Sequence, residues 1–100
     1  MKLGQLKVMV QFILQEVPRT RNSDNALYVE VCHMVAQKKG IDLDSMLFSR
    51  VFNSGEFPKY ESVSRVRRKI QEEQPELRAE ADVEAYRMLQ EEEFKKFARN

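Results

Sequence analysis

Apolar residues recur at helical spacing in five segments of this 100-residue chain, and this periodicity constrains the fold more than any other feature. Residues three or four positions apart share one face of a helix, so such a repeat predicts a helix that buries one side. The predicted helices span residues 3–17, 24–38, 43–53, 61–73 and 76–98. We therefore expect one all-α domain over residues 1–100, a compact bundle of about five helices with a long C-terminal helix.

Turn and capping residues mark the ends of several predicted helices. Pro18 ends the first helix, because the residue before a proline is pushed out of the α region. Ser23 or Asp24 is expected to cap the second helix by accepting a hydrogen bond from its first turn. Gly40 is expected to stop that helix, and Asn53-Ser54-Gly55 forms the next break.

Composition excludes several classes of protein. Hydrophobic residues make up 42% of the chain, too many for a disordered protein. The only cysteine, Cys32, cannot form an internal disulfide, which argues against a disulfide-stabilised secreted scaffold. The apolar runs are far shorter than the roughly 20 residues of a membrane span, and the N-terminal residues do not resemble a signal peptide. We therefore expect a soluble, cytoplasmic protein without membrane contacts.

The formal net charge of +1 hides a segregation of charge along the chain. Residues 59–71 contain five basic groups and one acidic group, a net charge of +4. Residues 72–100 contain five basic and nine acidic groups, a net charge of −4. A basic block beside an acidic one creates a local field of the kind that steers polyanions or protein partners.

The helices predicted at 43–53 and 61–73 follow one another in the order of a helix-turn-helix DNA reader. In that motif the second helix enters the major groove, where arginine pairs with guanine, glutamine pairs with adenine and other cations contact phosphates. Arg65 and Arg68, supported by Ser64, are the expected base readers, and Lys59, Arg67 and Lys69 the expected phosphate contacts. The predicted DNA-binding residues are Lys59, Ser62, Ser64, Arg65, Arg67, Arg68, Lys69 and Gln71.

Two features of this basic segment leave other interpretations open. Residues 53–60 form a longer connection than the usual three or four residues, so they are compatible with a plain turn or with a winged-helix-like wing. In addition, Arg65 follows Glu61 by four positions, and Arg68 and Lys69 each precede a glutamate by four. Such pairs stabilise an exposed helix by about 0.2–0.5 kcal/mol each, so a solvated charged face needs no ligand.

Residues 57–78 resemble small phage and prophage proteins of Gram-positive bacteria, which are often suspected of containing a helix-turn-helix. The shared pattern is Pro-x-x-Glu-Ser-Val/Ile-x-Arg-x-Arg-x-Lys-Ile-Gln-Glu-x-x-Pro-Glu-Leu, which begins here at Pro58 and ends at Leu77. A second shared segment, Arg-Asn-Ser-Asp-x-x-Leu, begins at Arg21. The resemblance covers about residues 19–99 and implies a regulatory or replication accessory protein with a winged-helix-like core, without implying a known activity.

No catalytic or metal-binding constellation is visible in the sequence. His33 is expected to face solvent, while Cys32 is expected to be a small buried group, so the two cannot enclose a metal ion. The chain has 3 glycines and no glycine-rich phosphate loop. We therefore expect neither an enzyme nor a protein with a cofactor or metal. The methionines at 9, 34, 46 and 88 are expected to fill the core.

Apolar residues outside the main helix faces suggest contacts with a partner. Val8 and Phe12 project from a second face of the first helix, and the last helix carries aromatic residues on one face. The predicted partner interface, which includes a possible homodimer contact, consists of Val8, Phe12, Tyr86, Phe94 and Phe97.

Two functional hypotheses follow from these observations. The first is a small phage-type protein that binds double-stranded DNA, against which the low net charge argues. The second is a protein-binding inhibitor or adaptor, for example of a host nucleic-acid enzyme such as a CRISPR nuclease. In that case the protein would use its acidic C-terminal helix, and the acidic face of residues 72–93 could imitate DNA phosphates. The binding face would be Glu72, Glu73, Glu76 and Glu80.

Overall fold

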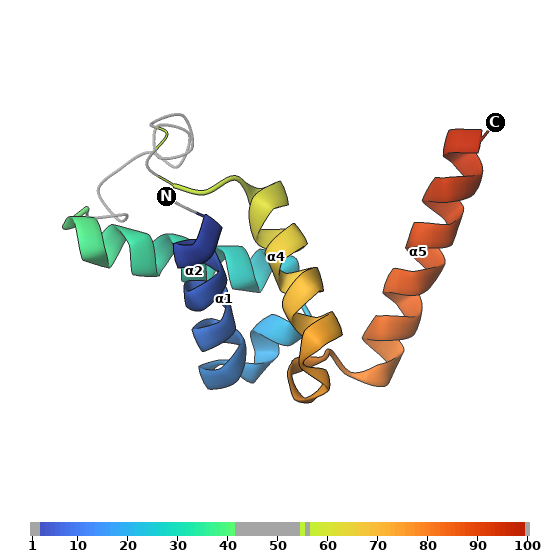
Figure 1. The fold of residues 1–100 in the computed structure, drawn as a ribbon, viewed down its shortest axis with the longest axis horizontal. Helices are drawn as coiled ribbons and strands as arrows, with labels where there is room; N and C mark the ends of the chain where they lie inside the picture. The colour runs from blue at the N-terminus through green and yellow to red at the C-terminus, as the bar shows by residue number, and fades with distance from the viewer. Residues whose placement is uncertain (1–2, 42–54, 56, 100) are drawn as a thin grey trace.

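A computed structural model of the chain describes residues 3–41, 55 and 57–99, with the side chains of 4–41, 55 and 57–96. These residues form four α-helices and two short 3₁₀ helices, without a strand (Figure 1). The α-helices are α1 (Leu3–Glu16), α2 (Asp24–Lys39), α4 (Tyr60–Glu73) and α5 (Ala81–Arg99), and the 3₁₀ helices are η1 (Pro18–Arg21) and η2 (Pro75–Leu77). The all-α prediction is confirmed. None of the described helices combines the length and hydropathy needed to cross a membrane.

The third predicted helix, 43–53, lies outside the described residues, and so do residues 53, 54 and 56 of the connection that could form a wing or a turn. The helix-turn-helix and winged-helix expectations depend on that segment and stay predictions.

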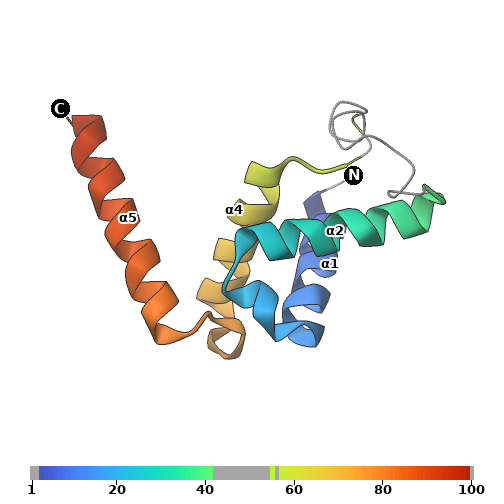
Figure 2. The same ribbon diagram turned by 180° about the vertical axis from the view of Figure 1, so that it is seen from behind.

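The core lies between α1, α2 and α4. Helix α2 crosses the pair formed by α1 and α4, which is most easily seen from behind (Figure 2). Val63, Val66 and Ile70 of α4 are buried against this core, as their spacing predicts. The largest side chains with less than 2% exposure are Leu14, Leu27, Ile70, Val10, Val31, Val35, Val63 and Thr20.

The ends of α1 and α2 agree closely with the turn signals in the sequence. Helix α1 ends at Glu16, and Pro18 begins η1. Ser23 caps α2, because its Oγ accepts a hydrogen bond of 3.2 Å from the backbone N–H of Ala26. Gly40 ends α2 in the left-handed conformation with φ of 68°, which glycine adopts without a steric penalty.

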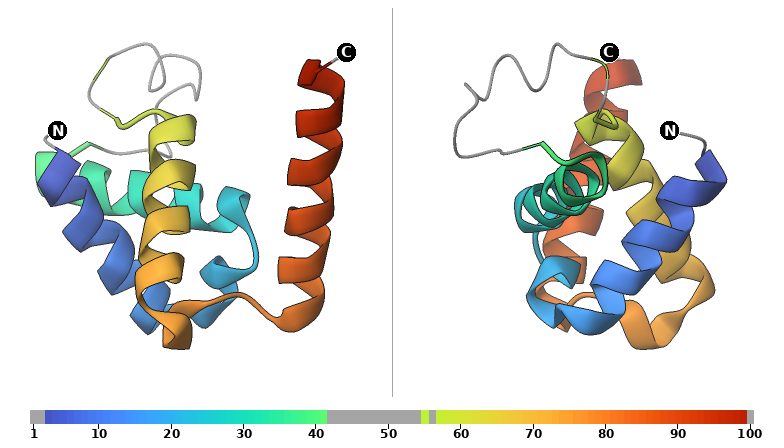
Figure 3. Two further views of the ribbon diagram at one scale, coloured as in Figure 1. Left: turned by 45° about the vertical axis from the view of Figure 1, so that its right-hand side comes forward. Right: turned by 90° about the vertical axis from the view of Figure 1, so that its left-hand side faces the viewer.

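Helix α5 begins at Ala81, later than the predicted start at residue 76. Pro75-Glu76-Leu77 forms η2 instead, and Leu77 anchors this connection in the core with 3% exposure. Beyond the connection, α5 runs back beside α4 but stands apart from it (Figure 3). Its described side chains are exposed or half-buried throughout, so α5 contributes none of the fully buried core.

Candidate functional site

The carboxylate of Asp24, the first residue of α2, receives three hydrogen bonds from α4. Arg67 binds it with two nitrogens, Nε to Oδ1 at 2.9 Å and Nη2 to Oδ2 at 3.1 Å. Ser64 Oγ donates to Oδ2 at 3.0 Å. This paired arrangement of guanidinium and carboxylate fixes both orientation and charge, and it fastens the start of α2 to the middle of α4.

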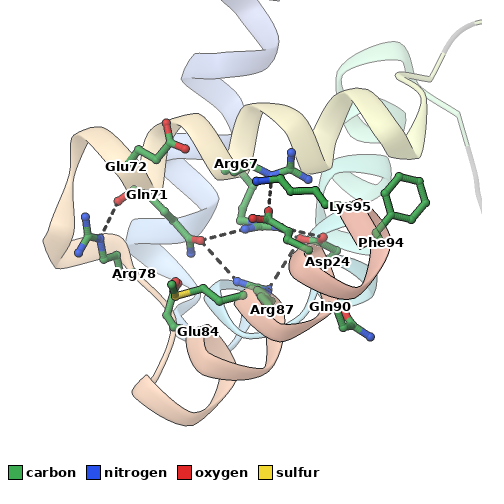
Figure 4. A pocket seen from close by; sticks show the side chains of 13 residues that line it. Asp24, Arg67, Gln71, Glu72, Arg78, Glu84, Arg87, Gln90, Phe94 and Lys95 are labelled. Atoms are coloured by element: carbon green, nitrogen blue, oxygen red, sulfur yellow. Dashed lines mark hydrogen bonds and ion pairs between the residues drawn. The ribbon is translucent and has the colours of Figure 1, made fainter. Parts of the chain in front are cut away.

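Gln71, one turn after Arg67, connects this ion pair to the rest of the chain. Its Oε1 accepts from Arg67 Nη1 at 3.2 Å, and its Nε2 donates to the carbonyl oxygens of Arg21 and Leu77 at 3.3 and 2.9 Å. Arg87 of α5 donates to the same Arg21 carbonyl at 3.2 Å. We call Asp24, Ser64, Arg67, Gln71 and Arg87 the polar junction; Figure 4 shows most of it converging from α2, α4 and α5.

A groove of about 960 Å³ opens beside the polar junction, between α4 and α5. Five basic and four acidic side chains line it, so its charge is nearly balanced. Arg68 of α4 and Glu91 of α5 approach each other there, with 3.7 Å between Nε and Oε1. The charged residues of the groove are Arg67, Arg68, Arg78, Arg87, Lys95, Asp24, Glu72, Glu84 and Glu91 (Figure 4).

Two ionisable groups of the junction have shifted pKa values. Burial disfavours the charged form of Asp24, but the hydrogen bonds and charge of Arg67, aided by Ser64 and Arg87, outweigh burial and lower its pKa. Burial and the nearby Arg67 guanidinium lower the pKa of Arg87. The ionised Asp24 carboxylate is therefore the counter-charge for both Arg67 and Arg87, since Arg87 Nη2 also lies 3.9 Å from its Oδ1.

The lowered pKa of Asp24 predicts a specific acid sensitivity. The unfolded chain takes up the Asp24 proton before the folded chain does, so this contribution to stability is complete above the ordinary aspartate pKa of about 3.9 and is lost as the pH falls through the lower folded value. The difference in unfolding free energy between wild type and Asp24→Asn should be constant from about pH 7 to about pH 5 and shrink below about pH 4. Urea titrations at these pH values measure it, and a difference that does not change with pH contradicts the prediction.

Arg67 and Gln71 are not available as DNA contacts. Their exposed fractions are 7% and 4%, and their polar groups are bound to protein atoms within the junction. The expectation that they flank an exposed basic face is therefore wrong. Ser64 is half-buried and its hydroxyl is committed to Asp24.

The other predicted DNA contacts lie at the surface. Lys59 and Lys69 are exposed, and Ser62 is half-buried. The Arg65 side chain is 77% exposed and lies 3.5 Å from Glu61 of the preceding turn. The Arg68 side chain is 56% exposed but faces Glu91. The basic face thus keeps four cations, of which two are near carboxylates of the same chain.

The predicted partner-interface residues whose side chains are described all reach solvent. On α1, Val8 and Phe12 are 71% and 51% exposed. On α5, Tyr86 and Phe94 are 62% and 75% exposed. The side chain of Phe97 lies outside the described part of the chain.

Two further apolar residues of α5 are exposed, and the sequence prediction had not included them in the interface. Leu89 is 62% exposed and Met88 is 64% exposed. Met88 is therefore not a core residue, and that prediction is wrong, whereas Met9 at 6% exposure is confirmed as one.

His33 and Cys32 have the environments that their helix positions predict. His33 is exposed, and Cys32 is a free, buried thiol whose pKa burial raises. Within residues 3–41, 55 and 57–99, no group of three or more histidine, cysteine, aspartate or glutamate residues is arranged to hold a metal ion.

Comparisons with known proteins do not assign a function to this site. The chain matches no protein-family model, and neither the curated proteins nor the solved structures provide a match to it.

Proposed function

We propose that the protein is a protein-binding module, and that α5 is its docking helix. The observation that carries this proposal is the exposure of four large apolar side chains on a helix that stands apart from the core: Tyr86, Met88, Leu89 and Phe94. As the sequence resemblance implies, it would serve as a phage-type accessory protein, in an adaptor or inhibitor role.

The chemistry of this surface supports protein binding. Tyr86, Leu89 and Phe94 surround a shallow hollow of about 630 Å³, together with Gln90 and Glu93. Contiguous exposed apolar patches commonly mark interaction sites, and aromatic residues are enriched at the centres of protein interfaces. Charged residues occupy other sides of the same helix, where Glu91, Glu92, Lys95 and Lys96 are all exposed.

The proposal predicts a site-specific contact between α5 and another polypeptide. A photo-cross-linking amino acid at Leu89 should form covalent adducts in cells that also contain the partner. The same group at Glu91, which is exposed and lies about 160° from Leu89 around α5, should form few. Electrophoresis and mass spectrometry identify the adducts. Equal adduct formation at both positions, or none at either, contradicts the proposal.

DNA binding is a second candidate, and the exposure of Lys59, Arg65 and Lys69 favours it. Each phosphate contact adds salt-dependent affinity. If these cations bind DNA, Arg65→Ala/Lys69→Ala should elute from duplex DNA at lower salt than wild type. The matched control is Arg19→Ala/Lys38→Ala, which removes two exposed cations from other elements, including one that pairs with a glutamate. Elution of both variants at the same salt concentration excludes a specific role for α4.

A further inference from the structure

We infer that the apolar face of α5 docks against the same face of a second copy of this chain, with the two helices antiparallel and centred on Gln90. This inference rests on the proposed function, because it names the partner of the docking helix. It follows from the order of residues along α5, from the direction of that face, and from the charges at the two ends of the helix.

The large side chains of this face are arranged symmetrically about Gln90. Tyr86 and Phe94 lie four positions before and after it, and Val83 and Phe97 lie seven positions before and after it in the sequence. At about 100° per residue, all of these positions fall within about 40° of the direction of Gln90. Two antiparallel copies centred on Gln90 therefore place Tyr86 of each helix at the level of the partner's Phe94. A two-fold interface requires this kind of self-complementarity.

This face lies only partly along the groove beside α4. Of the seven α5 residues that line the groove, Gln90 and Phe94 belong to this face. The other five, Glu84, Arg87, Met88, Glu91 and Lys95, centre roughly a third of a turn from Gln90. In Figure 4 the Gln90 side chain points away from Asp24 and Arg67. The side of α5 that carries Tyr86 and Phe94 is thus largely exposed to solvent in the single chain.

The charges on α5 select the antiparallel orientation. Asp82 and Glu84 lie in its first turn, whereas Lys95 and Lys96 lie near its other end. An antiparallel pair brings Asp82 close to the partner's Lys96 at both ends of the interface. A parallel pair would instead place each of these charges beside its own copy. Like charges in register are unfavourable, so the parallel arrangement is disfavoured.

Gln90 gives the pair a fixed register. A lone polar residue inside an apolar helix face weakens packing against an ordinary apolar core, but in this arrangement it lies opposite the partner's Gln90. Each carboxamide has donors and an acceptor, so the two can bond to each other. A single polar residue at such a position can specify register and orientation in paired helices. In the single chain, Gln90 Nε2 donates to the Tyr86 hydroxyl at 3.0 Å, which already holds both groups on this face.

The first test is the molar mass in solution, measured by light scattering over a range of concentrations. Wild type should approach twice the chain mass as its concentration rises. Tyr86→Glu/Phe94→Glu should raise the dissociation constant at least about 100-fold, because it buries unpaired carboxylates in the interface. Tyr86 and Phe94 are 62% and 75% exposed in the single chain, so the thermal unfolding of this variant's dilute monomer should match that of wild type. Glu92→Ala, on the far side of α5, is the matched control and should stay dimeric.

The second test distinguishes the orientation of the two helices. In a Cys32→Ala background, Gln90→Cys should cross-link to itself under mild oxidation, and Glu92→Cys should not. Tyr86→Cys mixed with Phe94→Cys should give a mixed disulfide dimer, whereas each alone should give little. Self-cross-linking of Tyr86→Cys and of Phe94→Cys, without the mixed dimer, would indicate a parallel pair and overturn the inference.

Failure of this inference differs from failure of the proposed function. A wild type that stays monomeric at every concentration overturns the self-pairing. If Leu89 adducts then contain only a different protein, α5 is a docking helix for that protein and the proposed function stands. If Leu89 forms no more adducts than Glu91, both are wrong. Two results together support the self-pairing and the proposed function: adducts of twice the chain mass at Leu89, and a disulfide-linked dimer of Gln90→Cys.

Discussion

Replacing Arg67 with alanine should lower the free energy of unfolding by about 3 kcal/mol, the lower part of the range for removing one partner of a buried ion pair. The substitution leaves the Asp24 carboxylate without its two strongest hydrogen bonds, at 2.9 and 3.1 Å. It also leaves Gln71 Oε1 without the Arg67 donor. We expect the loss of unfolding free energy to lie at the lower end of that range, because the Asp24 side chain is 22% exposed and keeps its hydrogen bond from Ser64. Urea unfolding followed by circular dichroism measures the change.

The matched control is Arg65→Ala, two residues away on the same helix. The Arg65 side chain is 77% exposed and its partner Glu61 is 83% exposed, so the expected change is within about 0.5 kcal/mol. Asp24→Asn/Arg67→Met should lose less stability than Arg67→Ala alone, because neither charge is then left unpaired. If Arg67→Ala and Arg65→Ala are equally stable, the junction does not hold the helices together.

Replacing Ile70 with alanine should cost about 3 kcal/mol, within the usual range for truncating a large buried aliphatic side chain. Ile70 has no exposed surface and belongs to the core shared by α1, α2 and α4. The substitution removes buried hydrocarbon and leaves a cavity that the surrounding helices cannot fully close. Thermal and urea unfolding should both show the loss.

Val8→Ala on α1 provides the comparison for Ile70→Ala. Val8 is 71% exposed, so its truncation should change stability by no more than about 0.5 kcal/mol. A large loss at Val8 in the isolated protein would mean that this side of α1 is already covered, for example in an oligomer. A small loss at Ile70 would mean that α4 is not part of the core.

Helical periodicity predicted the core more accurately than it predicted the basic face. Val63, Val66 and Ile70 share one side of α4, and all three are buried. Arg67 lies between Val63 and Ile70, three or four positions from each, which places it at the edge of the same side. This spacing is the signal that could have identified Arg67 as a buried residue. Its partner Asp24 is 43 residues away, so local spacing could not reveal the ion pair.

The exposed face of α5 shows a different limit of sequence patterns. An apolar stripe predicts that a helix buries one side, but it does not state which chain provides the covering surface. Tyr86 and Phe94 fit the stripe and are nonetheless exposed in the single chain. Gln90 at the centre of the stripe was the local signal that this contact differs from ordinary core packing.

The residues that carry the resemblance to phage proteins include many with structural roles here. Ser23 caps α2, and Asn22 Oδ1 accepts the backbone N–H of Glu80 at 2.9 Å. Arg67 and Gln71, from the other shared segment, belong to the polar junction. These positions join α2, α4 and η2 in the fold.

The base of α5 is attached to the core chiefly through polar groups. Arg87 reaches the Arg21 carbonyl at 3.2 Å, and Glu80 reaches Asn22 just before the helix begins. Hydrogen bonds of this kind contribute only about 1 kcal/mol each, since water can replace them, whereas separating an apolar contact exposes hydrocarbon. Breaking these few polar contacts therefore costs less than separating the helices of the core. We expect that a bound protein can change the position of α5 without unfolding α1, α2 and α4.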